Sequence, residues 1–373
     1  MALINKLSAI GDAIREKTGD TELMTLDAMP AAIRGIETGG GGGTEIEPIV
    51  LTGHCNYACA GQLAGIYISL YGDTISTKDI TSSDSMFYNY PFETIPFKMN
   101  MATGTAYIAL SRTFSNARKL KSVPEFNAAY PYNITAMFDY CESLRELPED
   151  FGGDWNWEQV HTISSIDASD IFSNCYSLRR IPETFLSQLW GVQTSGYAPV
   201  SGMCSNCFAL DELVNIPIHQ GKLTSNRFTG MISRCFRLRE CIFETNEDGS
   251  PKTANWKSQV IDFTSNTGWV NDRNNILFHN SGITADKEVT NDASYQALKN
   301  DPDWFSCDVA YSRYNHDSAV NTINSLPDCS ATGTNTLKFT GAAGSATDGG
   351  AINTLTEEEI AVAAARGWTV TFA

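Results

Sequence analysis

Basic residues are scarce in this chain. Lys and Arg together number 26 against 43 Asp and Glu, which gives the 373-residue sequence a formal net charge of −17. No run of basic residues interrupts this acidic background. Because nucleic acids carry a dense negative charge, an acidic chain without a basic patch is repelled by them. We therefore expect no nucleic-acid binding.

Long apolar runs are also missing. No window approaches the roughly 18 consecutive apolar residues that indicate a membrane-spanning helix, so we expect no membrane insertion. Residues 1–8 lack the apolar stretch and the small-residue cleavage site of a secretory signal peptide. We expect a protein that is made and folded in a cytoplasm.

Signs of catalytic or cofactor chemistry are few. The five histidines share no spacing typical of a metal site or a catalytic triad. The glycine run at 39–43 is not followed by the Lys-Ser or Lys-Thr of a phosphate-binding loop. We expect no enzyme activity, no cofactor and no metal. Carboxylates such as Asp150 with Asp154 or Glu158 leave a glycosidase pair open as an alternative.

What the chain does contain is a recurring motif between residues 85 and 243, roughly Phe-x-x-Cys-x-x-Leu-x-x-Ile-Pro. The copies that begin at Phe138 and Phe172 match at every apolar position. The first residue of the motif, which we call the Phe position, recurs at steps of 24 to 34 residues. Its six occupants are Phe87, Phe114, Phe138, Phe172, Cys204 and Ile232.

A repeat of this kind predicts stacked coils. One coil of about 25 residues cannot bury its apolar side chains alone, but neighbouring coils bury a continuous column of them. Each Leu or Ile removed from water contributes about 1.5–3 kcal/mol. We predict an α/β leucine-rich-repeat solenoid with one short parallel strand per coil, formed by Leu-x-x-Ile and ended by Pro. Phe-x-x-Cys would form a tight return.

The fourth residue of the motif, the Cys position, suits a small buried hydrophobic side chain. It is occupied by Cys141, Cys175, Cys207 and Cys235 in the four later copies. Cytoplasmic thiols stay reduced, so we predict free structural cysteines. The pairs Cys55 with Cys59 and Cys204 with Cys207 have the spacing of half a zinc site, but neither has a second pair.

A small helical module is expected before the coils, at residues 1–38. Apolar residues at helical spacing mark two short amphipathic helices: Ile4, Leu7, Ile10, Ile14, Leu26, Met29, Ile33 and Ile36. Two helices of this size are too small to form a stable core alone, so they would dock on copies of themselves or on a larger assembly. A Gly-rich linker at 39–48 would act as a flexible tether.

The remaining boundaries follow from composition. Residues 49–84 read as an N-terminal cap, 85–243 as the solenoid, and 244–373 as irregular coils with a C-terminal cap. In that cap we expect a short helix from Asp317, a strand at 337–339, a capping box that opens a helix at Thr356, and a final strand at 368–372. Residues 246–249 favour a hairpin turn, with calcium binding as the alternative.

Loops inserted in the two longest steps are the candidates for contact with a ligand. They carry Trp155, Trp157, His161, Trp190 and Tyr197. Aromatic faces of this kind stack on sugar rings or anchor a protein partner. The alternative is that the rings pack the loops onto the coils or lie between protomers.

The coils resemble the BspA-like leucine-rich-repeat family, and the segment from Val320 to Trp368 looks like the closing segment of such proteins in gut bacteria and their phages. Residues 4–19, with 26–30 and 33–36, are similar to the leader of phage tail and other virion-appendage proteins. The resemblance implies a homotrimeric tail or head fibre located on the virion. It would bind a virion tail or capsid protein through residues 1–38 and a host surface glycan or protein through the solenoid. The alternatives are a structural head fibre or decoration protein without a receptor role, and a polysaccharide depolymerase.

Overall fold

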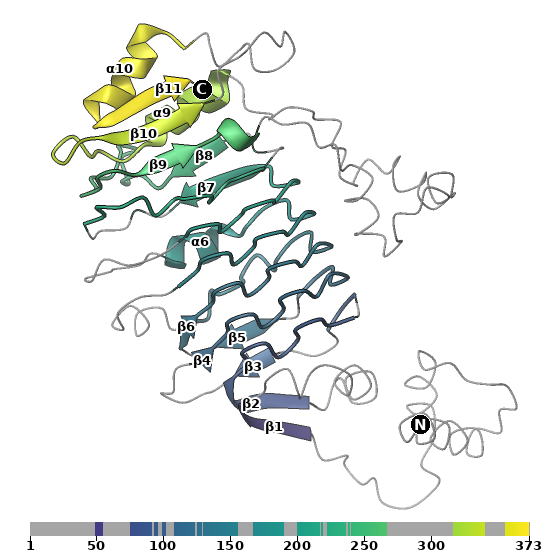
Figure 1. The fold of residues 1–373 in the computed structure, drawn as a ribbon. Helices are drawn as coiled ribbons and strands as arrows, with labels where there is room; N and C mark the ends of the chain where they lie inside the picture. Colours follow the sequence, from purple (N-terminus) through teal and green to yellow (C-terminus); the bar gives the residue numbers. More distant parts are fainter. Residues whose placement is uncertain are drawn as a thin grey trace, which may run out of the picture.

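The described part of the protein is a stack of coils. The computed structural model describes residues 49–54, 75–91, 93–95, 99–101, 108–123, 125–128, 130–155, 167–189, 200–216, 218, 222–235, 238, 240–266, 316–339 and 355–372. Figure 1 shows the coils following one another from β1 at one end to β11 at the other. The helical module expected at 1–38 and the linker at 39–48 lie outside these residues.

One side of the stack begins with a four-stranded parallel sheet. Its order is β1-β2-β4-β6, formed by β1 (Ile49–His54), β2 (Ile75–Ser82), β4 (Ile108–Ala109) and β6 (Pro131–Asn133). An isolated parallel bridge from Asn133 to Asp167 carries the pairing into the next coil. Strands from successive coils therefore pair in chain order, and the segment at 49–84 contributes two of them.

Further strands form two parallel pairs. β3 (Met99–Met101) pairs with β5 (Phe126–Ala128), and β7 (Glu212–Ile216) pairs with β8 (Glu240–Phe243). The expectation that Leu-x-x-Ile forms a strand is wrong for the copies at 120–123, 144–147 and 178–181, which are irregular. There the coils are joined by sparse bonds, such as Arg179 N to Arg145 O at 3.0 Å. Pro148 and Pro182 follow directly and have no amide hydrogen to extend a ladder.

The Phe-x-x-Cys part forms a tight turn, as predicted. Six-residue turn segments recur at 84–89, 111–116, 135–140, 169–174, 201–206 and 229–234. Alternate amides bond within the turn and to the next coil: Cys141 N donates to Phe138 O at 2.9 Å, and Phe138 N to Ile171 O at 2.8 Å. The residues two before and two after the Phe position are left-handed, with φ of 52° at Ala136 and 59° at Tyr140. Each turn thus satisfies its backbone groups locally and through its neighbour.

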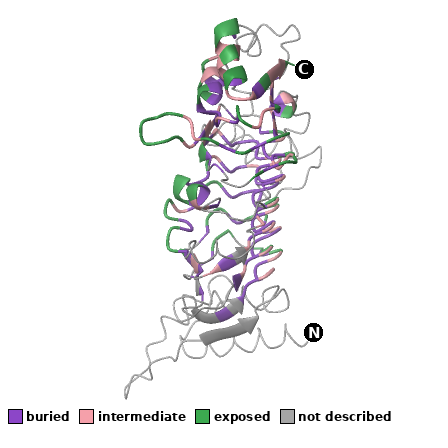
Figure 2. Ribbon diagram, turned by 90° about the vertical axis from the view of Figure 1, so that its left-hand side faces the viewer, coloured by how far each residue is buried: buried purple, intermediate pink, exposed green. Residues whose placement is uncertain are grey.

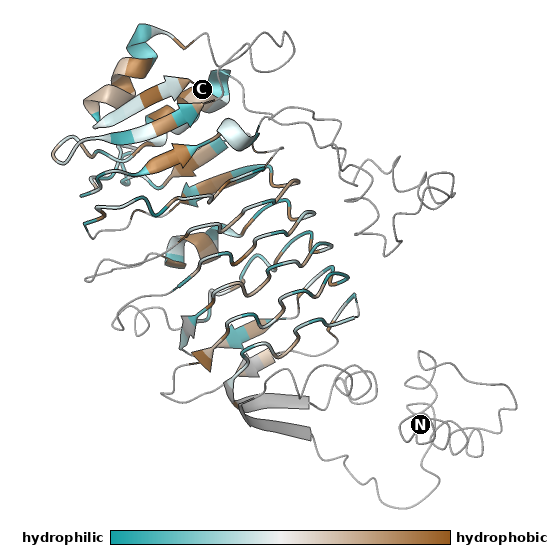
Figure 3. Cartoon of the chain, in the orientation of Figure 1, coloured by the Kyte–Doolittle hydropathy of each residue, from teal (hydrophilic) through white to brown (hydrophobic). Residues whose placement is uncertain are grey.

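Aromatic rings fill the centre of the first coils. The Phe87 and Phe114 ring centroids lie 5.4 Å apart, those of Phe114 and Phe138 5.1 Å, and those of Phe138 and Phe172 5.5 Å. The interplanar angles are 4°, 5° and 9°, so the rings stack in one column. Figure 2 shows buried residues running through the length of the stack, and Figure 3 shows apolar and polar residues interleaved along the coils.

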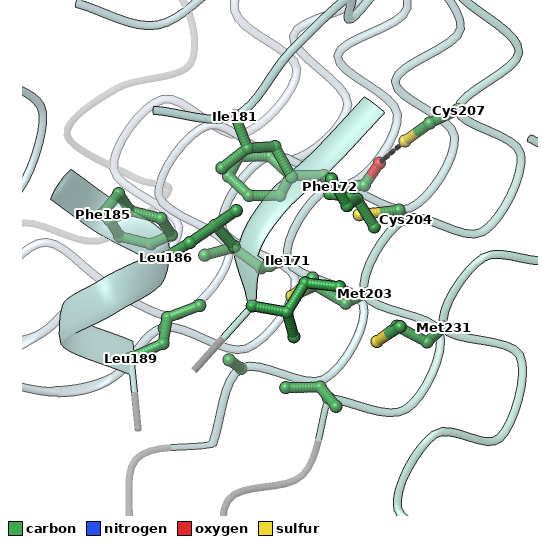
Figure 4. Packing of buried hydrophobic residues seen from close by; sticks show 14 of the residues in the cluster. Ile171, Phe172, Ile181, Phe185, Leu186, Leu189, Met203, Cys204, Cys207 and Met231 are labelled. Carbon is green, nitrogen blue, oxygen red and sulfur yellow. Dashed lines mark hydrogen bonds between the residues drawn. The ribbon is translucent and has the colours of Figure 1, made fainter. Parts of the chain in front are cut away.

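The Phe position changes at Cys204, and the core is completed there by an inserted helix. α6 (Glu183–Leu189) follows Pro182 and buries Phe185, Leu186 and Leu189. Figure 4 shows these side chains gathered near Phe172, with Cys204 and Met203 from the next coil. The Phe185 ring meets the Phe172 ring edge-on at 6.0 Å. The helix therefore supplies apolar bulk where the phenylalanine column ends.

The C-terminal region closes the stack with a three-stranded parallel sheet of order β11-β10-β9. Its elements are β9 (Val260–Asp262), η2 (Thr264–Asn266), α9 (His316–Ser325), β10 (Asn335–Phe339), α10 (Glu357–Ala365) and β11 (Trp368–Phe372). The capping box of Thr356 with Glu359 is present, as predicted. Gly367 ends α10 with φ of 77°, and a Cβ there would lie 2.7 Å from the Cys329 carbonyl oxygen.

Two smaller features complete the fold. The predicted hairpin turn is confirmed: Asn246 N donates to Ser250 O at 2.8 Å, and Gly249 has a φ of 78°. A buried amide joins the C-terminal sheet to the coils. Gln259 Nε2 donates to Ser225 O at 2.8 Å, and Gln259 N donates to Asn335 Oδ1 at 3.0 Å. These bonds tie the cap to the last coils.

Candidate binding surface

Trp155 is the one candidate contact residue from the inserted loops that lies in the described ranges, and it is buried. Its side chain is 4% exposed, and its indole N–H donates to the Phe126 carbonyl oxygen at 3.2 Å. The ring also lies 5.3 Å from the Phe151 ring. The packing alternative therefore holds for Trp155, and the proposal that it contacts a ligand is wrong. Trp157, His161, Trp190 and Tyr197 lie outside the described residues.

The candidate glycosidase carboxylates and the candidate zinc cysteines lie partly inside and partly outside the described residues. Asp150 and Asp154 are exposed on the turn that precedes Trp155, while Glu158 lies outside the described part. The seven cysteines within it are free and buried, Cys204 and Cys207 among them. Across the described ranges no three His, Cys, Asp or Glu side chains are grouped as metal ligands.

A groove of about 650 Å³ lies on the turn segments of the first three repeat copies, and we call it the turn groove. It is lined by Ser85, Tyr88, Arg112, Ser115, Asn116, Arg118, Asp139 and Tyr140. These residues occupy the same few offsets from the Phe position in successive copies. Because parallel neighbours lie about 4.8 Å apart, equivalent offsets in adjacent coils form rows across the groove.

Arg118 is held firmly at one side of the turn groove. Its guanidinium lies 5.6 Å from the centre of the Tyr140 ring and 3.2 Å from a carboxylate oxygen of Glu142. Its Nε donates to Asn116 Oδ1 at 2.8 Å. Glu142 is buried, so its charge is shielded from water and paired with the arginine. Arg118 thus positions the Tyr140 ring.

Tyr140 keeps 38% of its surface exposed. Within the described residues only Tyr140 and Phe372 are large hydrophobic side chains with such exposure. Its backbone is left-handed, a conformation that Asn adopts in the equivalent position of other copies, at Asn116 and Asn174. An aromatic ring is therefore presented where the fold itself would accept a small polar residue.

The charged side chains of the turn groove differ in their hydrogen bonds and ion pairs. Asp139 accepts a hydrogen bond from Asn174 Nδ2 at 3.0 Å. Burial raises the pKa of Asp139 above its ordinary value, and the nearby charge of Asp170 adds to this. Arg112 is exposed, with φ of 53°, and makes no ion pair with any residue in the described ranges. The groove therefore contains one arginine that is engaged by the protein and one that is not.

A row of rings and a cation continues from the turn groove into the later copies, at or just after their turn segments. The Tyr176 and Phe208 rings stack at 4.9 Å, and the Arg234 guanidinium lies 5.4 Å from the centre of the Phe208 ring. Burial, with a smaller contribution from the charge of Glu142, raises the pKa of Tyr176 to about 12. The row gives this side of the stack a mixed aromatic and cationic character.

The sequence motif does not predict this surface, because the residues that form it occupy the variable positions of the motif. Tyr140 stands two residues after the Phe position, and Arg118, Glu142, Tyr176 and Phe208 stand four after it. The recognisable signal was an aromatic or arginine residue recurring at a fixed offset in a turn.

Comparisons with known proteins add no assignment. No protein-family model, curated protein or solved structure matches the chain. Among the helices of the described ranges, none has both the length and the apolar character needed to cross a bilayer.

Proposed function

We propose that this chain is a phage virion appendage protein that displays leucine-rich-repeat coils and binds the surface of the host cell through them. The observation that carries the proposal is the turn groove. It places an exposed ring, an unengaged arginine and several hydroxyl and amide groups on backbone that is hydrogen-bonded from coil to coil. Such a rigid surface suits recognition, because little ordering entropy is lost on binding.

The sequence of residues 1–48 supports the virion part of the proposal. Their resemblance to the leader of virion-appendage proteins, followed by a Gly-rich tether, fits a module that docks on a tail or capsid protein. The same module would hold the copies together as a homotrimer. The C-terminal sheet closes the end of the stack that lies away from β1.

We propose binding without catalysis. The groups that line the turn groove are donors, acceptors, two guanidinium groups and two aromatic rings, which together suit a glycan or a polar protein surface. The carboxylates considered for a glycosidase, Asp150 and Asp154, are not among the residues that line it.

Binding of the fluorescently labelled full-length protein to host cells tests the proposal. Tyr140→Asn is the informative variant, because Asn occupies the equivalent left-handed position of neighbouring copies and should preserve the fold. Arg180→Asn is the control, since Arg180 is exposed and its pair with Glu149 is a surface ion pair of little energetic value. We expect cell binding to weaken for Tyr140→Asn alone. Wild-type protein that binds no host cell would refute the receptor role.

Location on the particle is tested separately. Immunogold imaging of intact virions should place the chain on the head or the tail, and light scattering should give three times the 40.8 kDa chain mass. The double variant Ile10→Asp with Leu26→Asp is expected to abolish incorporation. A chain that is found on the head and binds no cell would favour the structural alternative.

A further inference from the structure

We infer that the turn groove takes a carboxylate-bearing saccharide, with Arg112 binding the carboxylate and Tyr140 stacking on a sugar ring. The inference rests on the proposed function and names the chemical class that the groove selects.

The charge of the groove is the first argument. In a chain with a net charge of −17, Arg112 is exposed and lines the groove without an ion pair from the described residues. Arg118, by contrast, is committed to Glu142 and Asn116. A planar guanidinium presents two parallel N–H donors that match a carboxylate. Arg112 is therefore the cation available to a ligand.

The backbone at Arg112 is the second argument. Its φ of 53° lies in the left-handed region, which costs energy for a side chain with a Cβ. Equivalent positions in other copies hold Ser85, Ala136, Asp170, Gly202 and Gly230, none of which has a side chain as long as that of arginine. Conformational cost of this kind is typical of residues kept for function.

The exposed surface supplies the saccharide part of the inference. The Tyr140 ring is fixed by Arg118 and exposed to the groove, as a stacking platform requires. Ser115 and Asn116 add a hydroxyl and an amide that can bond sugar hydroxyls. The volume of about 650 Å³ falls in the range of small-molecule sites.

A monoanion fits the groove better than a phosphate. Asp139 lines the groove, and Asp84 beside it accepts a hydrogen bond from Ser111 Oγ at 2.8 Å. These two carboxylates repel additional negative charge, while Arg112 supplies a single compensating cation. A ligand group with one negative charge is therefore favoured over one with nearly two.

Titration calorimetry of the full-length protein tests the inference with matched probes. Trigalacturonic acid is compared with its methyl ester, and 3′-sialyllactose with lactose. We expect at least one acidic probe to bind about 10-fold or more tightly than its neutral partner, as the loss of a charge-assisted hydrogen bond implies. Arg112→Asn should remove that difference, because Asn tolerates the left-handed backbone. Arg180→Asn should leave it unchanged, and Tyr140→Asn should weaken acidic and neutral probes alike.

The outcomes separate this inference from the proposed function. Equal affinity for acidic and neutral probes, or an acidic preference that survives in Arg112→Asn, would overturn the inference while cell binding upholds the receptor role. Tighter binding of glucose 6-phosphate than of either acidic sugar would overturn it in favour of a phosphate-bearing polymer. Cell binding with no affinity for any of these sugars would also overturn it and point to a protein receptor. If the protein binds neither cells nor sugars, both the receptor role and the preference for an acidic saccharide are refuted.

Discussion

The thiol of Cys175 donates a hydrogen bond to the backbone carbonyl oxygen of Phe138 in the preceding coil, with Sγ 3.1 Å from the oxygen. The same bond joins Cys141 to Phe114 at 3.1 Å, Cys207 to Phe172 at 3.0 Å and Cys235 to Cys204 at 3.1 Å. Figure 4 shows the Cys207 bond as a dashed line. The motif therefore needs a residue that is small, apolar and able to donate.

Replacing Cys175 with alanine should lower the free energy of unfolding by about 1–2 kcal/mol, through a small cavity and a lost hydrogen bond. Urea denaturation followed by circular dichroism measures this change. Ser187→Ala, on the exposed face of α6, serves as the control and should stay within about 0.5 kcal/mol of the wild type. A Cys175→Ala protein as stable as the wild type would show that the thiol contributes nothing.

The buried thiols should resist modification in the folded protein. Burial raises the pKa of Cys141, Cys175 and Cys235 well above the ordinary value for a thiol, so the reactive thiolate is rarely formed. Maleimide labelling followed by peptide mass spectrometry should leave these three unmodified without denaturant and modify them fully in guanidinium. Rapid labelling of Cys175 in native buffer would contradict the structure.

The left-handed turn positions provide a reciprocal pair of substitutions. Gly230 has φ of 65° and ample space for a Cβ, whose nearest neighbour would be the Gly202 Cα at 3.9 Å. Gly230→Ala should therefore cost about 1 kcal/mol from backbone strain alone. Ala136→Gly, at the equivalent position, should be neutral or stabilising by a smaller amount, because a glycine also gains freedom in the unfolded chain. Thermal denaturation of the two variants measures the difference in stability, and equal destabilisation would refute the assignment of strain.

His316 should make the docking of the C-terminal helices depend on pH. Its pKa is raised first of all by a hydrogen bond with Asp317; burial opposes this rise, and the hydrogen bond with Glu359 and the charges of both carboxylates add to it. Its Nε2 lies 3.1 Å from a Glu359 oxygen, which joins α9 to α10. Because the folded pKa lies above the unfolded value of 6.5, this stabilisation is complete below pH 6.5 and is lost as pH rises through the folded pKa.

Hydrogen exchange in α9 and α10 at pH 6 and pH 8, corrected for the intrinsic rate, measures this effect. Protection should fall at the higher pH in the wild type and change less in His316→Gln. Identical pH dependence in the two proteins would show that the pair does not titrate in this range.

The sequence predicts those parts of the fold in which a residue type can be accommodated in only one kind of structure. The Phe and Cys positions predicted a core column because only stacking buries them, and Phe114, Phe138 and Cys175 lie in it. Thr356, Glu359 and Gly367 predicted the ends of α10 because capping and left-handed backbone restrict the residue type. These constraints are local and do not depend on distant contacts.

The remainder depended on contacts that a single sequence does not specify. Trp155 looked like an exposed ring in an inserted loop, but Phe126, Phe151 and Phe185 from three different segments enclose it. The turn groove arises only when equivalent offsets of neighbouring copies are brought side by side. Tyr140 is recognised as a possible contact residue only once Arg118 of the preceding coil is seen to lie against its partly exposed ring.

The pattern of amide bonds in the turns has a mechanical consequence. Each turn is linked to the next by hydrogen bonds such as Phe138 N to Ile171 O and Phe172 N to Met203 O, so tension applied between the two ends loads these links in series. We expect such a molecule to lengthen as its coils unfold one after another from an end. A sudden pulling force would then be spread over many small unfolding steps and would not break the whole stack at once.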